Sequence, residues 1–491
     1  MKILVDVTRW TLYDPTANGD NGLVCGPLVH INQGAKAQAM ELDRDHSGLC
    51  ESDRQRNRFS RRSLLKAGTL GALGLSLPEL LRSRAAETAR PARASSVLLV
   101  YAQGGISHHD SFDPKPQAPA EVRGEFKTIA TRLSGLRFSD RVPLLAERAD
   151  RYTLIRSMWH RETDHGVGSY YVLRGYVQPD PTFDRPENQL RAHPNIGSQV
   201  ARLLAPGSAM PPYMVVPGLS YLAKVNYYTA GWMGRDYDPF VLRSDPNLLA
   251  DRGGGLVPLL EVDAEMLQQR LGLLQALDSR RREFETSPAV EGTSIHFQKA
   301  CELLLSGVAR QALDLRCESR QTRDAYGRTR LGQSCLLGRR LVEAGVPFVT
   351  VDDDGWDHHG QIFRSLENQL PVLDRAFSAL LDDLDTRGLL DTTLVLLLTE
   401  FGRTPVINKS VGRDHWPRVF SIIVAGAGIP QGQVLGASDR VGGEPIQRPI
   451  TPKDVAATIY SFLGLDPFQE YASTQGRPFK VLDAGEVIRE L

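Results

Sequence analysis

Histidine or carboxylate side chains that could bind a metal occur at four places in this sequence, together at three of them, and each place adjoins a run of apolar residues. Imidazole nitrogens and carboxylate oxygens together suit Zn²⁺, Mn²⁺ or iron. A set this rich also suits two metals, which can activate water and neutralise a phosphoryl-like oxyanion together. We therefore expect one or two divalent ions, drawn from Zn, Mn, Fe or Ca. The candidate ligands are His108, Asp110, Asp357, His359, Glu400 and His415.

The apolar runs beside these residues have the composition of buried strands. They consist of leucine and β-branched residues without polar alternation, which is typical of strands covered on both faces in a parallel sheet. In such a sheet, ligands bind outside the carboxyl ends of the strands, so the loops would bring the candidates to one crevice. The runs are Val97–Tyr101, Val346–Val351, Thr393–Thr399 and Val419–Val424.

Helices are expected between and after these strands. Apolar residues recur at three- or four-residue steps over about Phe363–Leu384. Pro371 should kink this helix and Gly388 should end it. A second helix is expected to open at Thr451, with Asp454 in its first turn. Alternation of strand and helix predicts an α/β fold, with a mostly parallel central sheet and helices on both faces.

The domain organisation is predicted from changes in pattern along the chain. Residues 96–491 are expected to form one domain of this fold. Within it, residues 177–345 are less regular and are interpreted as insertion and cap material around the sheet, with a long helical segment over roughly Ala264–Leu341. Residues 1–57 read as an irregular extension with no assigned function, and residues 58–95 as a signal segment and linker.

The signal segment carries a twin arginine, Arg61-Arg62, ahead of a mildly apolar run from Ala67 to Leu81. This pattern is typical of bacterial export of folded proteins, which suits a protein that takes up a metal before it leaves the cytoplasm. A membrane-spanning helix needs about 20 apolar residues, so the run does not predict a stable span. We expect a periplasmic or secreted protein that meets the twin-arginine export machinery.

Two groups of polar residues have more than one interpretation. The run Asp352–Asp354 is interpreted as solvated or helix-capping rather than as metal-binding. Arg403 is either a guanidinium that binds a planar oxyanion or a partner for Glu400, and the sequence leaves both open.

The composition excludes some classes of protein. Hydrophobic residues make up 41% and charged residues 24%, which is ordinary for a soluble globular protein. The formal net charge is zero, so nothing points to nucleic acid or to an anionic membrane. The five cysteines include no Cys-x-x-Cys pair, which argues against a zinc knuckle.

From about residue 60 to the C-terminus the chain resembles a bacterial family known as DUF1501, usually exported by the twin-arginine route. That family in turn resembles the alkaline phosphatase superfamily, which includes sulfatases and cofactor-independent phosphoglycerate mutases. The resemblance implies a central sheet with helices on both faces and a di-metal site at the strand ends. The matching stretches are SRRSLLKAG, GGISHHDSFDPKP, RSMWHRETDHGVGSYYVLRGY, YGRTRLGQSCLLGRRLVEAGVPFVTV, GWDHHG, TEFGRTP and GRDHWP.

The resemblance assigns ligands position by position. An Asp and a nearby His follow one strand in the superfamily, which matches Asp357 and His359, and a further His precedes the last strand, which matches His415. An Asp-His pair follows a later strand there. This chain has Glu400-Phe401 at that place, so the carboxylate is kept and the imidazole is lost.

Two further positions depart from the superfamily pattern. The ligand after the first strand is usually an Asp, and Asp110 or His108 would serve here, displaced along the loop. The nucleophile, a Ser, Thr or modified Cys, lies nine residues before a Thr-Gly that ends the next helix. The equivalent dipeptide here is Arg174-Gly175, so the count reaches His165, as a ligand, a nucleophile or a remnant, and Ser169 lies one turn later.

These observations lead to two functional hypotheses. The first is an exported metal-dependent hydrolase of phosphate or sulfate esters, acting on a small molecule or a glycan, with His165, Ser169 or a water activated for attack and Arg403 holding the anion. A formylglycine sulfatase is disfavoured because neither Cys-x-Pro-x-Arg nor Ser-x-Pro-x-Arg occurs. The second hypothesis is a non-catalytic exported protein that binds a metal or a glycan on the same scaffold. The lost imidazole at Phe401 and the departure from the superfamily pattern at the nucleophile position favour it.

Overall fold

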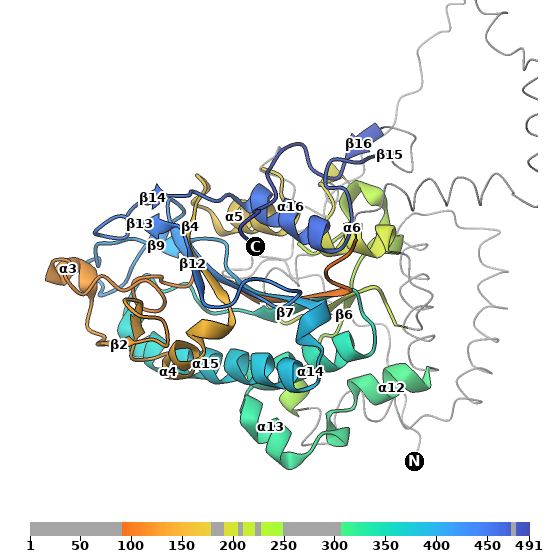
Figure 1. Ribbon diagram of the computed structural model, residues 1–491, viewed down its shortest axis with the longest axis horizontal. Coiled ribbons are helices and arrows are strands. Elements are labelled where there is room, and N and C mark those ends of the chain that lie inside the picture. The colour runs from red at the N-terminus through yellow and green to blue at the C-terminus, as the bar shows by residue number, and fades with distance from the viewer. Residues whose placement is uncertain (1–90, 178–190, 205–209, 221–226, 249–305, 473–477) are drawn as a thin grey trace, which may run out of the picture. The chain divides into compact units, whose positions relative to one another are not determined.

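The computed structural model describes residues 91–177, 191–204, 210–220, 227–248, 306–472 and 478–491. An eight-stranded sheet with the order β12-β4-β11-β8-β1-β7-β5-β6 lies at its centre (Figure 1). Within this sheet β11 alone runs antiparallel to its neighbours β4 and β8. The strands are β1 Ser96–Ala102, β4 Thr153–Met158, β5 Tyr213–Val216, β6 Phe240–Val241, β7 Phe348–Asp353, β8 Thr393–Leu398, β11 Phe420–Ala425 and β12 Gln433–Leu435.

All four apolar runs form strands of this sheet, and every residue of β1, β7, β8 and β11 is buried. The mostly parallel sheet expected from the sequence is confirmed, and its one reversed strand is the last of these runs, because β11 is antiparallel to β8. This reversal matters for the loops. The segment that precedes β11 lies at the same edge as the segments that follow β1, β7 and β8.

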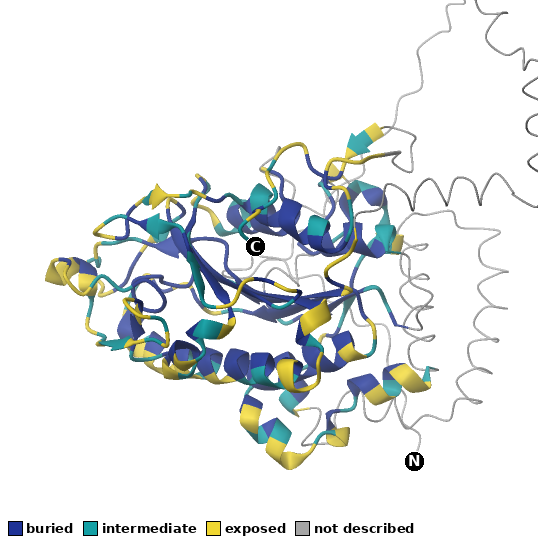
Figure 2. Ribbon diagram, in the orientation of Figure 1, coloured by how far each residue is buried: buried dark blue, intermediate teal, exposed yellow. Residues whose placement is uncertain are grey.

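Helices cover both faces of the sheet (Figures 1 and 2). Alternate residues of β1 face opposite layers: Leu98 packs into the core shared with α14 and α15, and Leu99 into the core shared with α5, α6 and α16. Burial on both faces explains why the strand sequences are continuously apolar. The helices are α5 His165–Arg174, α6 Ile196–Leu203, α14 Arg330–Glu343, α15 Ile362–Thr386 and α16 Pro452–Phe462.

The two helices expected from the sequence both form. Helix α15 contains Pro371 within its length and ends where predicted, since Gly388 has a φ of 67° and its N–H bonds Asp385 O at 2.9 Å. Helix α16 opens with a capping box, in which the backbone N–H of Thr451 donates to the Asp454 carboxylate at 2.8 Å. These local signals fix where each helix begins or ends.

The region 177–345 contributes more than cap material in its described part, because β5, β6, α6 and α14 belong to the sheet and its covering layers. The expected long helix Ala264–Leu341 lies partly outside the described residues. Its described part is three separate helices, since Ser306, Ser319 and Thr329 each cap a new start. The first two are α12 Gly307–Leu313 and α13 Arg320–Tyr326.

The remaining described elements are short. The helices are α3 Ala120–Arg123 and α4 Pro143–Glu147, and 3₁₀ turns occur at Ala149–Arg151, Gly231–Met233, Arg235–Tyr237, Leu315–Cys317 and Leu390–Thr392. Two-stranded ribbons pair β2 Thr128–Ala130 with β3 Arg137–Ser139, β9 Gly402–Arg403 with β10 His415–Trp416, β13 Ala437–Ser438 with β14 Pro445–Gln447, and β15 Glu470–Ala472 with β16 Pro478–Lys480.

The expected extension 1–57 and most of the signal segment 58–95 lie outside the described residues. None of the helices in the described ranges is long and apolar enough to cross a membrane.

Candidate metal centre

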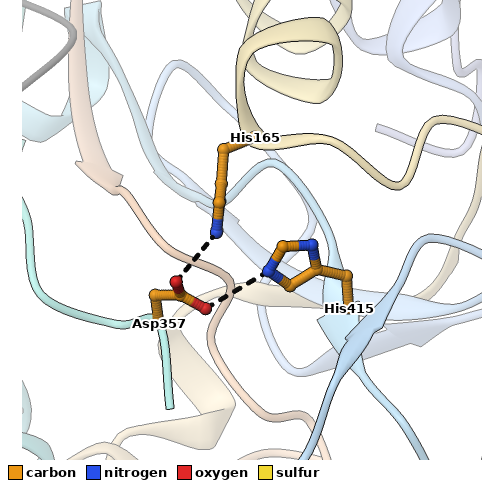
Figure 3. Close-up of side chains that lie close together, drawn as sticks. All are labelled: His165, Asp357 and His415. Atoms are coloured by element: carbon orange, nitrogen blue, oxygen red, sulfur yellow. Dashed lines mark hydrogen bonds and ion pairs between the residues drawn. The ribbon is translucent and has the colours of Figure 1, made fainter. Parts of the chain in front are cut away.

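Three imidazole rings converge on one carboxylate at the edge where β7 and β8 end. His165 Nε2 lies 3.2 Å from Asp357 Oδ2, and His415 Nε2 lies 3.2 Å from Asp357 Oδ1 (Figure 3). One ligand atom from each of these three residues lies within 4.8 Å of the others. His359 joins them, because its Nε2 lies 3.0 Å from Asp357 Oδ1 and 2.9 Å from His415 Nε2. We call these four residues the His₃Asp cluster.

Three different parts of the fold deliver the four members of the cluster. His165 is the first residue of α5, whose start is fixed by Asp164, which accepts from the backbone N–H of Gly166 at 2.8 Å. Asp357 and His359 lie in the loop after β7. His415 begins β10, in the segment before β11. The antiparallel direction of β11 therefore brings His415 to the same edge as Asp357.

The far nitrogen of each ring is held by an acceptor. His165 Nδ1 bonds Glu400 Oε1 at 2.7 Å, His359 Nδ1 bonds Asp414 Oδ1 at 2.7 Å, and His415 Nδ1 bonds the carbonyl of Thr163 at 2.6 Å. Because carboxylate and carbonyl oxygens only accept, each ring carries a proton on Nδ1. A neutral ring therefore presents a bare Nε2 lone pair to the cluster, as metal-binding histidines do.

The charges of the cluster are strongly coupled. Burial lowers the pKa of His165, but contacts with Asp357 and Glu400 raise it by more, to about 9. Burial likewise raises the pKa of Asp357, whereas His165, His415 and Arg403 lower it by more, to well below its usual range. The carboxylate is therefore ionised at neutral pH, and the cluster attracts positive charge.

The arrangement of His165, Asp357 and His415 fits a small divalent cation. Three Nε2 lone pairs facing a carboxylate repel it unless a proton or a cation lies between them, and in the metal-free protein a proton on His165 Nε2, 3.2 Å from Asp357 Oδ2, meets that need. Bonds of about 2.0–2.1 Å to a tetrahedral Zn²⁺ require ligand atoms roughly 3.3 Å apart. Asp357 lies 3.0–3.2 Å from each imidazole and His359 lies 2.9 Å from His415, close to that spacing, and the ligand atoms of His165, Asp357 and His415 all lie within 4.8 Å of one another. Three imidazoles and one carboxylate suit zinc, manganese or iron.

Glu400, a predicted ligand, contacts the cluster through His165 Nδ1 and not through the nitrogen that faces Asp357. Its side chain is fully buried. Oε1 accepts from His165 and from the backbone N–H of Gly104, both at 2.7 Å. Oε2 accepts from the hydroxyls of Tyr101 and Thr399, both at 3.3 Å. The structure therefore places Glu400 behind His165, with its oxygens already engaged.

Arg403 contacts Asp357 and several backbone carbonyls. Its side chain is fully buried, and Nη2 donates to Asp357 Oδ1 at 2.6 Å. The same guanidinium donates to the backbone carbonyls of Gly104, Gly105, Trp356 and Arg413. Its hydrogen-bonded carboxylate partner is thus Asp357, while Glu400 attracts it by charge without a hydrogen bond among the contacts described.

The structure does not bring His108 and Asp110 into the cluster. His108 is buried, and its Nε2 bonds the carbonyl of Gly442 at 2.9 Å. The Asp110 carboxylate takes a bond from Ser107 at 2.5 Å and two from Arg413, at 2.8 and 3.3 Å. The Asp110 carboxylate is therefore fully paired, and His108 is bonded to the loop at Gly442. Both residues stabilise the loops next to the cluster.

Ser169 is also remote from the cluster surface. It lies one turn into α5, is fully buried, and accepts from the hydroxyl of Tyr101 at 2.8 Å. Phe401, at the position where the imidazole is lost, packs its ring 5.0 Å from that of His165 and 4.6 Å from that of His415. It forms an apolar wall against two of the three imidazoles.

The first two residues of the acidic run, which end β7, are buried instead of solvated. Asp352 accepts from the hydroxyls of Ser220 and Tyr228, and burial raises its pKa to about 7 despite these bonds. Asp353 accepts from Trp356 Nε1 at 3.0 Å. The interpretation as solvated or capping residues is therefore wrong for both, because both side chains point into the protein and find donors there.

Sequence reasoning missed Asp414 and Thr163, which orient two of the three imidazoles. Asp414 is the residue before His415, and that adjacency was the available signal. Nothing in the sequence pointed to the carbonyl of Thr163, since any residue would supply it.

Comparisons with known proteins place the chain in a family without identifying an activity. A family model described as "Protein of unknown function (DUF1501)" matches residues 94–491. No curated protein sequence matches the chain.

Several solved structures have a distant likeness to the chain. The lipoteichoic acid synthase LtaP from Listeria monocytogenes is 8% identical with a TM-score of 0.38, covering 76% of this chain and 73% of its own. The PsFucS1 sulfatase from Pseudoalteromonas sp. is 10% identical with a TM-score of 0.37, covering 75% and 68%. An alkaline phosphatase from the Antarctic bacterium TAB5 is 13% identical with a TM-score of 0.33, covering 76% and 99%. Likenesses this distant carry no argument about the activity of this chain.

Proposed function

This chain belongs to the DUF1501 family, and we propose that it is a metal-dependent hydrolase of phosphate or sulfate esters. One observation carries the proposal: three imidazole Nε2 atoms converge on Asp357 while each ring is held at Nδ1 by its own acceptor. Structural histidines seldom need three oriented lone pairs at one point, whereas a metal centre does. The choice of esters follows the resemblance of the sequence motifs to the alkaline phosphatase superfamily.

The residues of the chain have distinct tasks in this proposal. His165, Asp357, His359 and His415 would hold the ion, and Glu400 and Asp414 keep two of the rings in the correct tautomer. Arg403 holds Asp357 in place. A bound divalent ion would polarise the ester and lower the pKa of a water. Phe401 excludes water from one side of the imidazoles.

The proposal is tested by hydrolysis and metal content measured together. We expect purified protein to hydrolyse a phosphate or sulfate ester from a broad panel, to lose that activity on chelation, and to regain it with one divalent metal. Asp357→Ala should abolish both metal retention and hydrolysis. Asp354→Ala removes a carboxylate three residues earlier that pairs with Arg330, and should leave both unchanged. Metal retention by Asp357→Ala equal to that of the wild type would refute the assignment.

A second function, binding without turnover, is supported by a different observation. The predicted nucleophile Ser169 is fully buried and the predicted anion holder Arg403 is engaged by the protein itself. Both facts suit a protein that binds a metal or a glycan on this scaffold. Tight metal binding with no hydrolysis across the ester panel would favour this second function.

The proposal also includes export of the protein from the cytoplasm. The twin arginine at Arg61-Arg62 supports passage through the twin-arginine machinery to the periplasm or beyond. Replacing both with lysine should retain the protein in the cytoplasm, as measured by fractionation. Unchanged secretion of the double-lysine variant would contradict export by this route.

A further inference from the structure

We propose that Asn408 is a positioning residue of the metal centre, whose amide nitrogen joins the main chain of His359 to the carboxylate that orients the His359 ring. This inference rests on the proposed metal centre and concerns its most exposed histidine. The side chain of His359 is 47% exposed, so its ring depends on hydrogen bonds for its orientation.

Asn408 lies in the loop between β9 and β10, and all the hydrogen-bonding groups of its side chain are engaged. Oδ1 accepts from the backbone N–H groups of Ser410 at 3.0 Å and Gly412 at 2.9 Å. Nδ2 donates to the carbonyl of His359 at 3.0 Å and to Asp414 Oδ1 at 3.2 Å. Two donors and two acceptors around it fix the orientation of the amide. Asp414 Oδ1 is also the atom that bonds His359 Nδ1.

A second loop shows which of these contacts the turn itself requires. Asp439, between β13 and β14, accepts through Oδ1 from the backbone N–H groups two and four positions later, those of Val441 at 3.1 Å and Gly443 at 2.7 Å. In both loops the N–H three positions later also donates to the carbonyl of the first residue, at 3.1 Å for Asn408 and 3.2 Å for Asp439. An aspartate therefore serves this turn as an asparagine does. The turn needs no amide nitrogen, and that of Asn408 serves the metal centre.

The main chain of the loop lies close to the segment that carries His359. A Cβ added at Gly412 would lie 2.1 Å from the carbonyl carbon of His359, so only glycine allows this approach. The backbone N–H of Ile362 donates to the carbonyl of Val411 at 2.9 Å. The loop and the His359 segment are thus joined through main chain as well as through the Asn408 side chain.

Asn408→Asp tests the inference, because it keeps the acceptor that the turn uses and replaces the donor with an oxygen that faces two acceptors. We expect zinc affinity, measured by calorimetry on full-length protein, to fall about 10- to 100-fold, the usual effect of losing a partner of a metal ligand. The added negative charge would by itself attract a cation more strongly, so a fall reports lost positioning. Asp439→Asn, the matched control in the equivalent turn, should keep the wild-type affinity.

A double-mutant cycle separates positioning of His359 from a general disturbance. In a His359→Ala background, Asn408→Asp should cause no further loss of zinc affinity. The ligand atoms of His165, Asp357 and His415 lie within 4.8 Å of one another and remain to bind zinc there. X-ray absorption of Asn408→Asp at saturating zinc reads the same effect without that background, as one imidazole fewer than in the wild type. An equal loss of affinity in both backgrounds, or an unchanged imidazole count, would overturn the inference.

A second pair of variants keeps the test open if Asn408→Asp does not fold, as judged by thermal unfolding. Gly412→Ala should push the loop away from His359 and weaken zinc binding. Gly443→Ala is its matched control, since the nearest atom to its Cβ would lie at an ordinary 3.4 Å. Wild-type affinity in folded Asn408→Asp or Gly412→Ala would overturn the inference and leave the metal centre intact. No zinc binding by the wild type would overturn the metal centre itself, and the inference with it.

Discussion

The chemistry of this site is set by which nitrogen of each imidazole carries the proton. Glu400, Asp414 and the carbonyl of Thr163 each accept from an Nδ1, so all three rings direct Nε2 toward Asp357. Loss of any one acceptor would let its ring rotate or change tautomer, and the lone pair would leave the cluster. Orientation of the ligands is therefore as important to the site as their identity.

Metal binding should release a proton from His165. In the metal-free protein the pKa of this ring is raised to about 9, so the ring is protonated at neutral pH and an ion must displace that proton. We expect zinc affinity to rise about tenfold per pH unit up to about pH 9 and then to level off. Calorimetry in buffers of different ionisation enthalpy should count about one proton released per zinc at pH 7.5. Binding without proton release would contradict this assignment.

The same pKa shift predicts the pH dependence of stability in the metal-free protein. The folded-state pKa of His165 lies above the ordinary value of 6.5, so its stabilisation is complete below about pH 6.5. It is lost as the pH rises through about 9. The thermal unfolding temperature of stripped protein should fall over that interval, and zinc should remove the fall.

Glu400 should act on the metal through His165. Glu400→Gln removes the charge that holds the proton of His165 on Nδ1 and leaves a weaker amide acceptor, so we expect zinc affinity to fall about 10- to 100-fold. Ser169→Ala is the control, because Ser169 lies in the same buried network through Tyr101 but contacts no imidazole of the cluster. A zinc affinity in Glu400→Gln equal to that of Ser169→Ala would show that Glu400 does not orient His165.

At the scale of elements, the site forms where the ends of β7 and β8 lie at the same edge as the segment that precedes the reversed strand β11. The loops after β7 and β8 supply Asp357 and Glu400, and the segment before β11 supplies His415. The loop after β1 plays a different part. His108 and His109 bond the carbonyls of Gly442 and Val441 at 2.9 and 2.7 Å and so fix a loop beside β10.

His108→Ala separates this structural role from the ligand role first considered for His108. The variant leaves the Gly442 carbonyl without its donor, which should cost about 1–3 kcal/mol of unfolding free energy. Zinc affinity and stoichiometry should stay at the wild-type values, as measured by calorimetry on folded protein. Loss of bound zinc with unchanged stability would make His108 a ligand after all.

The elements were predictable where the signal is local. Continuous apolar runs marked β1, β7, β8 and β11, and Gly388 and Thr451 marked a helix end and a helix start. The direction of β11 was not predictable, because an apolar run reads the same for a parallel or antiparallel strand buried on both faces. The breaks at Ser319 and Thr329 were missed, although Ser and Thr are common helix N-caps and could have signalled them.

At the scale of the whole molecule, the candidate site was predictable in its residue types but not in its pairings. Asp357, His359 and His415 lie together as their positions at strand ends suggested. Two buried arginines determine the remaining pairings. Arg403 bonds Asp357, and Arg413 bonds Asp110, whose carboxylate therefore does not join the cluster. Those ion pairs join residues 46 and 303 positions apart, and no local pattern in the sequence encodes them.

X-ray absorption at the metal edge of zinc-loaded protein tests the central claim most directly, because it reports the atoms bound to the ion. The account predicts a four-coordinate zinc with imidazole nitrogens at about 2.0–2.1 Å, with the outer-ring scattering of three histidines and one carboxylate oxygen. His359→Ala should reduce the imidazole count by one. An oxygen-only coordination shell, or an unchanged imidazole count in that variant, would contradict the His₃Asp centre.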